Sequence, residues 1–189
     1  MTRYVYYTAT TLDGFLADDQ DSLAWLFRQE IDQGGEGGYD GFIEGIGALA
    51  MGATTYEWIV AHLGDEPWSY TQPSFVFTHR DLAPVHETVS IVQGTPASHR
   101  AALEEAAGGR DVWVVGGGDL AAQFAEDGML DEVQVACAPV TLGRGRPLFP
   151  RRWDLALESS AVNGAFVCST YRVLGPLAED QDAAVVTSA

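Results

Sequence analysis

The sequence contains no lysine, only two cysteines and no apolar run long enough to cross a bilayer. The chain has ten arginines and 27 acidic residues, which gives a formal net charge of -17 at pH 7. Because nucleic acids and anionic membranes are bound by clustered cations, we expect neither as a partner. The N-terminus has a strand pattern without the apolar core and cleavage site of a signal peptide, so we expect a cytoplasmic location.

The signatures of several catalytic classes are missing as well. Asp19 and Asp21 begin like a calcium loop, but Leu23 and Leu26 stand where a ligand and a glycine are needed. No GxSxG turn and no Walker sequence is present, so acyl and phosphoryl transfer have no support. No histidine has metal-ligand spacing to a cysteine or carboxylate, and we predict no metal site; the histidines are His62, His79, His86 and His99.

The length of 189 residues is typical of one domain, which buries roughly 70% of the surface of the unfolded chain. No disulfide is needed, and we interpret Cys137 and Cys168, within strand-like runs, as reduced core residues. We predict a single domain over residues 1–174 and a frayed tail over residues 175–189.

Short apolar runs between turn signals predict six strands before Pro139. These runs are Tyr4 to Ala9, Ile46 to Met51, Ser74 to Thr78, Val89 to Val92, Val112 to Val115 and Val133 to Ala138. Helices are predicted after Asp21 or Ser22, after Thr54 or Thr55 over Tyr56 to His62, from Thr95 through Ala107, and after Gly118. Gln33 to Gly41 holds five glycines and is expected to be a mobile loop, either a lid or slack chain.

The pattern changes after Pro139. Leu155 to Ala161 and Ala165 to Leu174 alternate in polarity around Asn163-Gly164, a strong hairpin signal. We therefore predict an α/β fold with a mixed sheet that is parallel early and ends in an antiparallel hairpin. The cluster Arg144, Arg146, Arg151 and Arg152 is interpreted as a solvated loop, with an anion site as the alternative.

Three glycines join a buried strand to a helix at Gly116-Gly117-Gly118. Residues without side chains let a diphosphate approach the backbone, and the amides at a helix start favour its negative charge. A second strand–glycine–helix unit contains Gly52, Thr54 and Thr55. At the end of a third strand, Thr78, His79 and Arg80 offer polar groups, and Arg80 is suited to a ribose phosphate. Together these units predict a nicotinamide dinucleotide site.

The chain resembles the dihydrofolate reductase superfamily, in the branch of the C-terminal reductase domain of bifunctional riboflavin-biosynthesis enzymes. The matching segments are Thr11 to Ala17, Met51 to Glu57, Val115 to Leu120, Leu130 to Val133 and Pro139 to Phe149. The resemblance implies a three-layer α/β/α sandwich, an NADPH-dependent reductase, a homodimer and a cis peptide between Gly116 and Gly117. The 5-amino-6-(5-phosphoribosylamino)uracil reductases and the dihydrofolate reductases are the activities it implies.

The resemblance also assigns residues to the cofactor. Gly52, Thr54 and Thr55 would contact its phosphates, and Gly116, Gly117, Gly118, Asp119 and Leu120 would surround its diphosphate. Thr78, His79 and Arg80 would lie near the adenosine ribose, and Ala9, Leu16 and Ala17 beside the nicotinamide. NADPH is the expected cofactor, and NADH is the alternative.

The sequence departs from this family on the substrate side. Ser22 occupies the place of the carboxylate that binds the pterin, with Asp21 one residue earlier as the candidate acid. Ala53 replaces an arginine of the second motif, and Ala121 replaces an aromatic residue after the glycine turn. Because Ala53 removes one expected contact to the phosphate that distinguishes NADPH from NADH, a preference for NADPH would depend on Arg80 alone.

A small heterocycle, such as a pterin, a pyrimidine or a riboflavin precursor, is the expected substrate. The candidate substrate-binding residues are Phe15, Trp25, Tyr56 and Gln134. Hydride transfer needs mainly orientation and a proton source from the protein, because the nicotinamide carries the chemistry. Two other readings stay open: a non-catalytic protein that binds a nucleotide or small molecule in the same cleft, and a structural dimer module.

Overall fold

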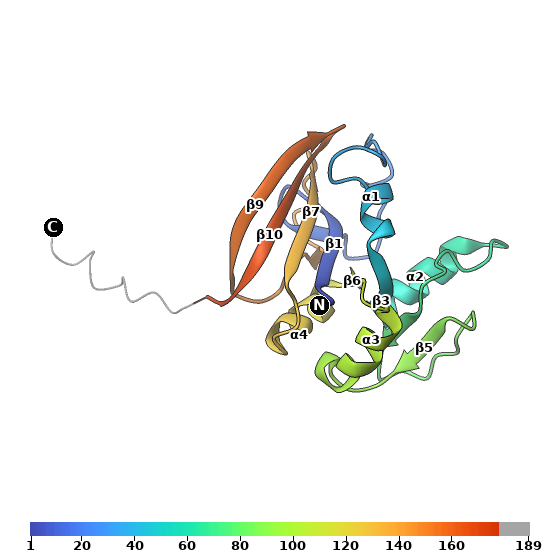
Figure 1. Cartoon of the computed structure of the whole chain (residues 1–189). Coiled ribbons are helices and arrows are strands. Elements are labelled where there is room, and N and C mark those ends of the chain that lie inside the picture. Colours follow the sequence, from blue (N-terminus) through green and yellow to red (C-terminus); the bar gives the residue numbers. More distant parts are fainter. Residues whose placement is uncertain (178–189) are drawn as a thin grey trace.

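The computed structural model describes residues 1–177, and its centre is an eight-stranded sheet with the order β5-β4-β3-β6-β1-β7-β10-β9 (Figure 1). Its strands are β1 (Tyr4–Thr11), β3 (Ile46–Gly52), β4 (Ser74–Phe77), β5 (Val89–Val92), β6 (Asp111–Gly116), β7 (Glu132–Ala138), β9 (Trp153–Asn163) and β10 (Phe166–Pro176). The helices are α1 (Tyr39–Glu44), α2 (Ala53–Leu63), α3 (Arg100–Ala107) and α4 (Gly118–Glu126), with a 3-10 turn, η1, at Pro96–His99. Short β2 (Phe15–Ala17) and β8 (Arg146–Pro147) pair with each other.

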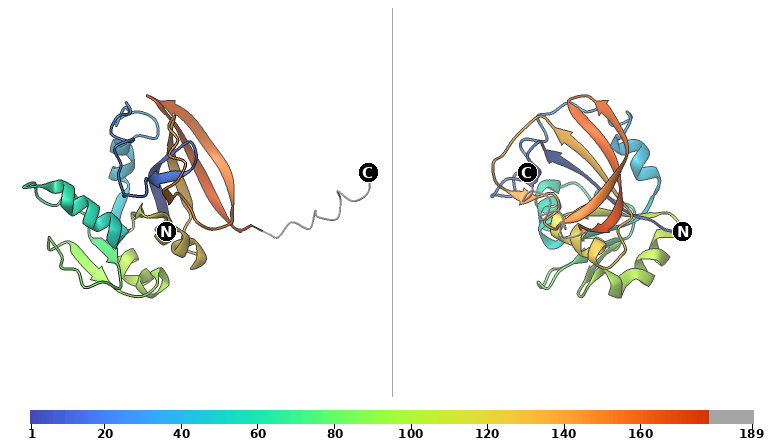
Figure 2. Two further views of the ribbon diagram at one scale, coloured as in Figure 1. Left: turned by 180° about the vertical axis from the view of Figure 1, so that it is seen from behind. Right: turned by 90° about the vertical axis from the view of Figure 1, so that its left-hand side faces the viewer.

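The sheet is mixed, as predicted. Neighbours from β5 to β7 run parallel, whereas β10 pairs antiparallel with both β7 and β9. The β9–β10 hairpin lies on one side of the molecule and β5 with α2 on the opposite side, as the view from behind in Figure 2 also shows. Asn163-Gly164 forms the predicted hairpin turn, and Gly164 has the positive φ of +58° that glycine tolerates.

Helices cover both faces of the sheet, which confirms the three-layer α/β/α sandwich. Along β6 the side chains alternate between the faces, so Val112 and Val114 pack with Leu103 of α3 and Phe124 of α4. Trp113 points the other way, into a cluster with α1 and α2. The unbroken apolar sequences of β3 and β6 are therefore explained by the burial of both faces of these strands.

Several helices predicted from the sequence differ from those in the structure. The segment after Ser22 forms turns instead of a helix, since its backbone bonds join Leu26 to Leu23 and Gln29 to Leu26. The helix expected at Tyr56 begins at Ala53, with Gly52 as a cap that has no side-chain hydrogen bond. The helix expected from Thr95 to Ala107 is divided into η1 and α3, with Gly108 left-handed at its end.

Strand lengths also differ from the sequence prediction. β1 runs to Thr11, two residues beyond the predicted end, while β4 stops at Phe77. The small β2–β8 ribbon was not predicted. The tail expected from residue 175 is wrong at its start, because Gly175 and Pro176 continue β10, and its part from residue 178 lies outside the described residues.

The glycine-rich segment from residue 33 to 41, which was expected to be a mobile loop, is packed against the sheet. A Cβ added to Gly37 would lie 2.6 Å from the Cβ of Cys168, and one added to Gly35 would lie 2.9 Å from the amide nitrogen of Asn163. Its last residues begin α1, whose Phe42 ring stacks on Tyr7. The glycines therefore allow this segment to pack tightly against β10 and the hairpin turn.

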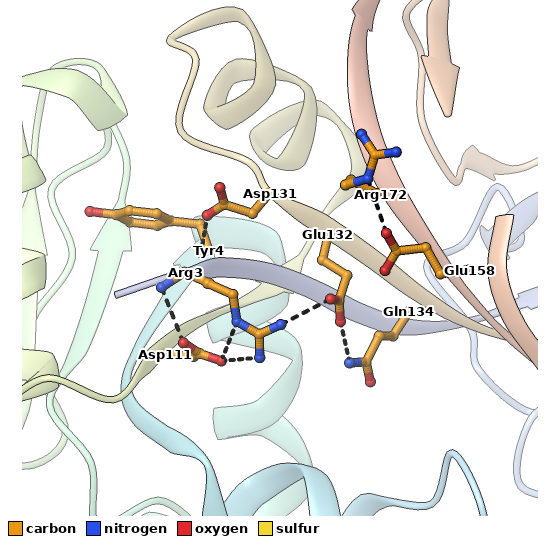
Figure 3. A network of polar contacts seen from close by, with 8 residues as sticks. All are labelled: Arg3, Tyr4, Asp111, Asp131, Glu132, Gln134, Glu158 and Arg172. Carbon is orange, nitrogen blue, oxygen red and sulfur yellow. Dashed lines mark hydrogen bonds and ion pairs between the residues drawn. The ribbon is translucent and has the colours of Figure 1, made fainter. Parts of the chain in front are cut away.

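The amino ends of three neighbouring strands are joined by a polar network (Figure 3). The Arg3 guanidinium donates to Asp111 at 2.6 Å and to Glu132 at 3.1 Å, and the Tyr4 amide donates to Asp131 at 2.8 Å. This network lies at the end of the parallel strands opposite to their carboxyl ends. It holds the N-terminal strand in the centre of the sheet.

Both cysteines are unpaired, and burial raises the pKa of each thiol. Cys168 is buried as predicted, whereas Cys137 is half-buried. No helix within residues 1–177 is both long and apolar enough to cross a membrane. In the same residues, no group of three or more metal-ligating side chains is arranged to hold an ion.

Candidate functional site

The two strand–glycine–helix units lie side by side. β3 and β6 are parallel neighbours, and Met51 at the end of one is opposite Gly116 at the end of the other. A Cβ added to Gly52 would lie 3.8 Å from the Gly116 carbonyl oxygen and 3.9 Å from the Gly117 nitrogen. Both turns therefore meet at one edge of the sheet, and the Gly116–Gly117 peptide is cis, as the resemblance implied.

Each turn opens directly into a helix whose first amides have no side-chain cap. Gly52 is the N-cap of α2 and Gly117 is the N-cap of α4, and neither helix has a side-chain hydrogen bond at its cap. The first amides of a helix have no partner within the helix, and its amino end carries partial positive charge. Two such ends side by side suit a diphosphate.

Both turns line a cleft of about 610 Å³. Following the strand order, it is lined by Gly94 after β5, Thr78 after β4, Gly52, Gly116 and then Ala9 on β1. Four strand spacings of about 4.8 Å each make this path about 19 Å long, which is enough for an extended dinucleotide. Ligands of open α/β sheets gather at this edge.

Most residues predicted for the cofactor line this cleft. They are Ala9, Leu16, Ala17, Gly52, Thr54, Thr55, Thr78, His79, Gly116, Gly117, Gly118, Asp119 and Leu120. Arg80 lies at the rim, where its guanidinium contacts the Glu57 carboxylate at 2.6 Å and the Thr54 hydroxyl at 3.5 Å. Ala121 is fully buried in the core and does not line the cleft.

The predicted substrate residues do not line the cleft. Tyr56 is buried in the core, and its hydroxyl donates to the Ala83 carbonyl at 2.8 Å. Trp25 is buried too, and its indole N–H donates to the Leu16 carbonyl at 3.1 Å, so it positions a residue that does line the cleft. Phe15 is in the β2–β8 ribbon. Gln134 donates to Glu132 at 2.6 Å, and belongs to the polar network (Figure 3).

The candidate acid Asp21 lines the cleft but is held by an arginine. Arg146 donates from Nε to Oδ1 at 2.6 Å and from its terminal nitrogen to Oδ2 at 2.9 Å, in a bidentate pair. These hydrogen bonds lower the pKa of Asp21, although partial burial opposes the shift. A carboxyl group that is ionised at neutral pH is a weak proton donor, which argues against the predicted role as an acid.

The four arginines of the cluster are exposed, as predicted, and three of them, Arg144, Arg146 and Arg151, form ion pairs on the surface. Besides Arg146, Arg144 contacts Asp19 at 3.0 Å, and Arg151 contacts Glu126 at 2.7 Å and Asp119 at 3.2 Å. The Arg146–Asp21 and Arg144–Asp19 pairs join the segment after β2 to the segment around β8. Backbone packing adds to this, since a Cβ on Gly145 would collide with the Ala17 carbonyl.

Sequence reasoning missed the apolar part of the lining. These residues include Leu23, Leu26, Trp58, Phe77, Val115, Pro147 and Pro150. Trp58 had a signal in the sequence, because it lies one helical turn after Thr54 on a helix already assigned to the site. Leu23 and Leu26 had none, since only the folded chain brings their segment to α2.

Comparisons with known proteins agree with this geometry. Residues 65–163 match the family model described as the RibD C-terminal domain. An uncharacterised protein of Bacillus subtilis, YwjB, is 30% identical over 147 residues, which cover 78% of this chain and 82% of that protein.

Two solved structures have the same fold. A protein of Shewanella sp. PV-4, provisionally named as a riboflavin biosynthesis protein, superposes with a TM-score of 0.76 at 25% identity over 92% of this chain and 99% of that one. Dihydrofolate reductase from Enterococcus faecalis, solved as a complex with NADP(H), has a TM-score of 0.56 at 15% identity over 90% and 96% of the two chains. The superfamily expected from the sequence is confirmed.

Proposed function

The chain belongs to the RibD C-terminal domain family, and from this membership we propose that it is a nicotinamide-dependent reductase of a small heterocycle. Hydride transfer to a pterin, a pyrimidine or a riboflavin-precursor-like compound is the reaction proposed. NADPH is the proposed cofactor, with NADH as the alternative. The family and the dihydrofolate reductase-like fold support a reductase role, because relatives of this fold include an enzyme solved with NADP(H).

The observation that carries this proposal is the pair of uncapped helix starts. α2 and α4 begin at Gly52 and Gly117 on neighbouring strands, and both open onto the same cleft. α2 has no acidic residue in its first turn, whereas α4 has Asp119 there, whose carboxylate accepts from Arg151 at 3.2 Å and from Gln123 at 2.8 Å. The donor set therefore fits a dinucleotide diphosphate.

The remaining contacts follow the order of the strands. Gly52, Thr54 and Thr55 would hold one phosphate group, and Gly116 to Leu120 would hold the other. Thr78 to Arg80 would lie near the adenosine ribose, at the end of the cleft formed by β4 and β5. Ala9, Leu16 and Ala17 would lie beside the nicotinamide, which supplies the hydride when it is bound.

Replacing Gly117 by valine tests the proposed cofactor site. The Gly117 backbone has φ -83° and ψ -178°, which valine adopts, and an added Cβ meets no protein atom within 4 Å. We expect a folded protein whose cleft is blocked and whose affinity for NADPH falls at least about a hundredfold, as for loss of several charge-assisted hydrogen bonds. Binding is measured by quenching of tryptophan fluorescence, since Trp58 lines the cleft.

The matched control is Gly41→Val. Gly41 is an exposed glycine of α1 with no atom within 4 Å of an added Cβ, and it does not line the cleft. This variant should bind NADPH like the wild type. Unchanged affinity in Gly117→Val would contradict the site, and no quenching by submillimolar NADPH or NADH in the wild type would contradict the reductase itself. Oxidation of NADPH with a heterocycle then separates an enzyme from a protein that only binds.

A further inference from the structure

Two short segments that line the cleft leave the main sheet together. One follows β1 and forms β2, and it contributes Leu16 and Ala17 to the lining. The other follows β7 and forms β8, and it contributes Arg146 and Pro147. Because β2 and β8 pair with each other outside the main sheet, the β2–β8 ribbon forms one wall of the cleft. The contacts that hold this ribbon therefore set the shape of that wall.

The Asp13 carboxylate joins the two segments at the point where they leave the sheet. Its Oδ2 accepts from the backbone amides of Gly143 at 2.6 Å and Leu142 at 3.0 Å. Its Oδ1 accepts from the Thr11 hydroxyl at 2.6 Å. The oxygen of that hydroxyl accepts in turn from the amide of Phe15, the first residue of β2, at 3.0 Å. One carboxylate thus connects the end of β1, the start of β2 and the loop before β8.

These hydrogen bonds suit an ionised carboxylate, because charged acceptors form shorter and stronger hydrogen bonds than neutral ones. The Thr11 hydroxyl, and after it the two amides, lower the pKa of Asp13, although desolvation opposes the shift. Asp13 is exposed, and beside it the Leu12 amide donates to the Val140 carbonyl at 2.7 Å. We therefore expect a chain without this carboxylate to stay folded, with the two segments held less firmly.

The same ribbon is packed against the start of α4. A Cβ added to Gly118, the first residue of α4, would collide with the carbonyl oxygens of Pro147 and Leu148. The Leu148 amide also donates to the Gly14 carbonyl at 2.9 Å, next to Asp13. A displacement of the ribbon therefore changes the distance between the β2 wall of the cleft and the helix start that faces it.

We propose that Asp13 is a positioning residue for the nicotinamide end of the cleft, because it fixes the β2–β8 ribbon against α4. This rests on the proposed function, which places the nicotinamide beside Leu16 and Ala17. Asp13 itself does not line the cleft, and it acts through the ribbon. A wall that is held in its bound geometry before the ligand arrives binds more tightly, since less freedom is lost on association. The adenosine end, at β4 and β5, is formed without the ribbon.

Two ligands that differ only in the nicotinamide ring test this role. NADPH has the ring, and 2′-phospho-ADP-ribose is the same molecule without its nicotinamide. Both are titrated into the full chain by isothermal titration calorimetry, and the ratio of their affinities measures the contribution of the ring. In Asp13→Ala we expect this ratio to fall at least about fivefold, while the affinity for 2′-phospho-ADP-ribose stays within about twofold of the wild type.

Variants at Thr11 test the other side of the same hydrogen bond. Thr11→Ser keeps the hydroxyl that donates to Asp13, whereas Thr11→Val removes it. The ratio should fall in Thr11→Val and stay at the wild-type value in Thr11→Ser. Asp154→Asn, at an exposed carboxylate of β9 far from the ribbon in the strand order, is the control and should leave both affinities unchanged.

The outcomes separate this proposal from the proposed function. An unchanged ratio in Asp13→Ala, or an equal loss of affinity for both ligands, overturns the positioning role, because a chain that is merely less folded loses both to the same extent. A ratio that falls as far in Thr11→Ser as in Thr11→Val overturns the part of the hydroxyl. Equal affinities for both ligands in the wild type overturn the present proposal and leave the dinucleotide site standing. If neither NADPH nor NADH binds to the wild type, it is the proposed function that fails.

Discussion

Among single residues, Arg80 is the one that we propose sets the preference between NADPH and NADH. It is the arginine beside the amino end of α2, because Ala53 stands where the family has another. Its guanidinium lies 2.6 Å from the Glu57 carboxylate, and both side chains are about half exposed. The phosphate that distinguishes NADPH from NADH would therefore have to share Arg80 with Glu57.

Substitutions at these two positions should change the preference in opposite directions. Arg80→Gln should lower the ratio of NADPH to NADH affinity about fivefold, since an exposed charge pair contributes at most about 1 kcal/mol. Glu57→Gln should raise the ratio, because it frees the guanidinium. Tryptophan quenching by both cofactors measures the ratio. An identical ratio in wild type and Arg80→Gln would show that Arg80 does not contact the phosphate.

At the scale of secondary structure elements, the hairpin turn is joined to the glycine-rich segment by one buried side chain. Asn163 accepts from the Asp32 amide at 2.9 Å and donates to the carbonyls of Asp32 at 2.8 Å and Glu36 at 3.1 Å. A Cβ on Gly164 would collide with the Glu30 carbonyl, so the chain is in close contact here. The Asn-Gly pair thus forms a turn and also binds a distant segment.

Asn163→Ala should lower the free energy of unfolding by about 2–3 kcal/mol. The substitution leaves one amide and two carbonyls without their partners in a region from which water is largely excluded. Urea unfolding followed by fluorescence measures the change, and Ser160→Ala, at an exposed position of the same strand, is the control. A loss equal to that of the control would mean that these hydrogen bonds contribute little.

For the whole molecule, the β9 edge of the sheet is where we propose that a second copy binds. In the described part of the chain β9 has a strand neighbour on one side only, so its other side has free backbone groups. Leu157 is 60% exposed on β9 and Leu174 is 55% exposed on β10. Because an antiparallel pair of identical edge strands is self-complementary, we propose a homodimer formed through β9.

Light scattering after size exclusion tests this assembly. The wild type should have twice the 20.3 kDa mass of one chain. Leu157→Glu should weaken the dimer at least about tenfold by burying a charge, whereas Leu12→Glu, a 69% exposed site outside the main sheet, should leave it intact. A monomeric wild type would contradict the proposed homodimer.

The sequence alone determined the features that depend on near neighbours along the chain. Apolar runs predicted the strands, Asn163-Gly164 predicted the hairpin, and the glycines at 52 and 116–118 predicted two turns where helices begin. Such patterns are readable because backbone conformation and burial periodicity are local properties. The resemblance to a family added the order of the cofactor contacts and the cis peptide.

The tertiary structure decided which side chains meet across long separations. Asp21 and Arg146 are 125 residues apart in sequence, and their pairing changes a predicted acid into a partner of an arginine. Tyr56 and Trp25 proved to be core residues, while Trp58 lies in the cleft. Identical residue types serve as core or site depending on which wall of the fold they face, and that depends on the packing of segments remote in sequence.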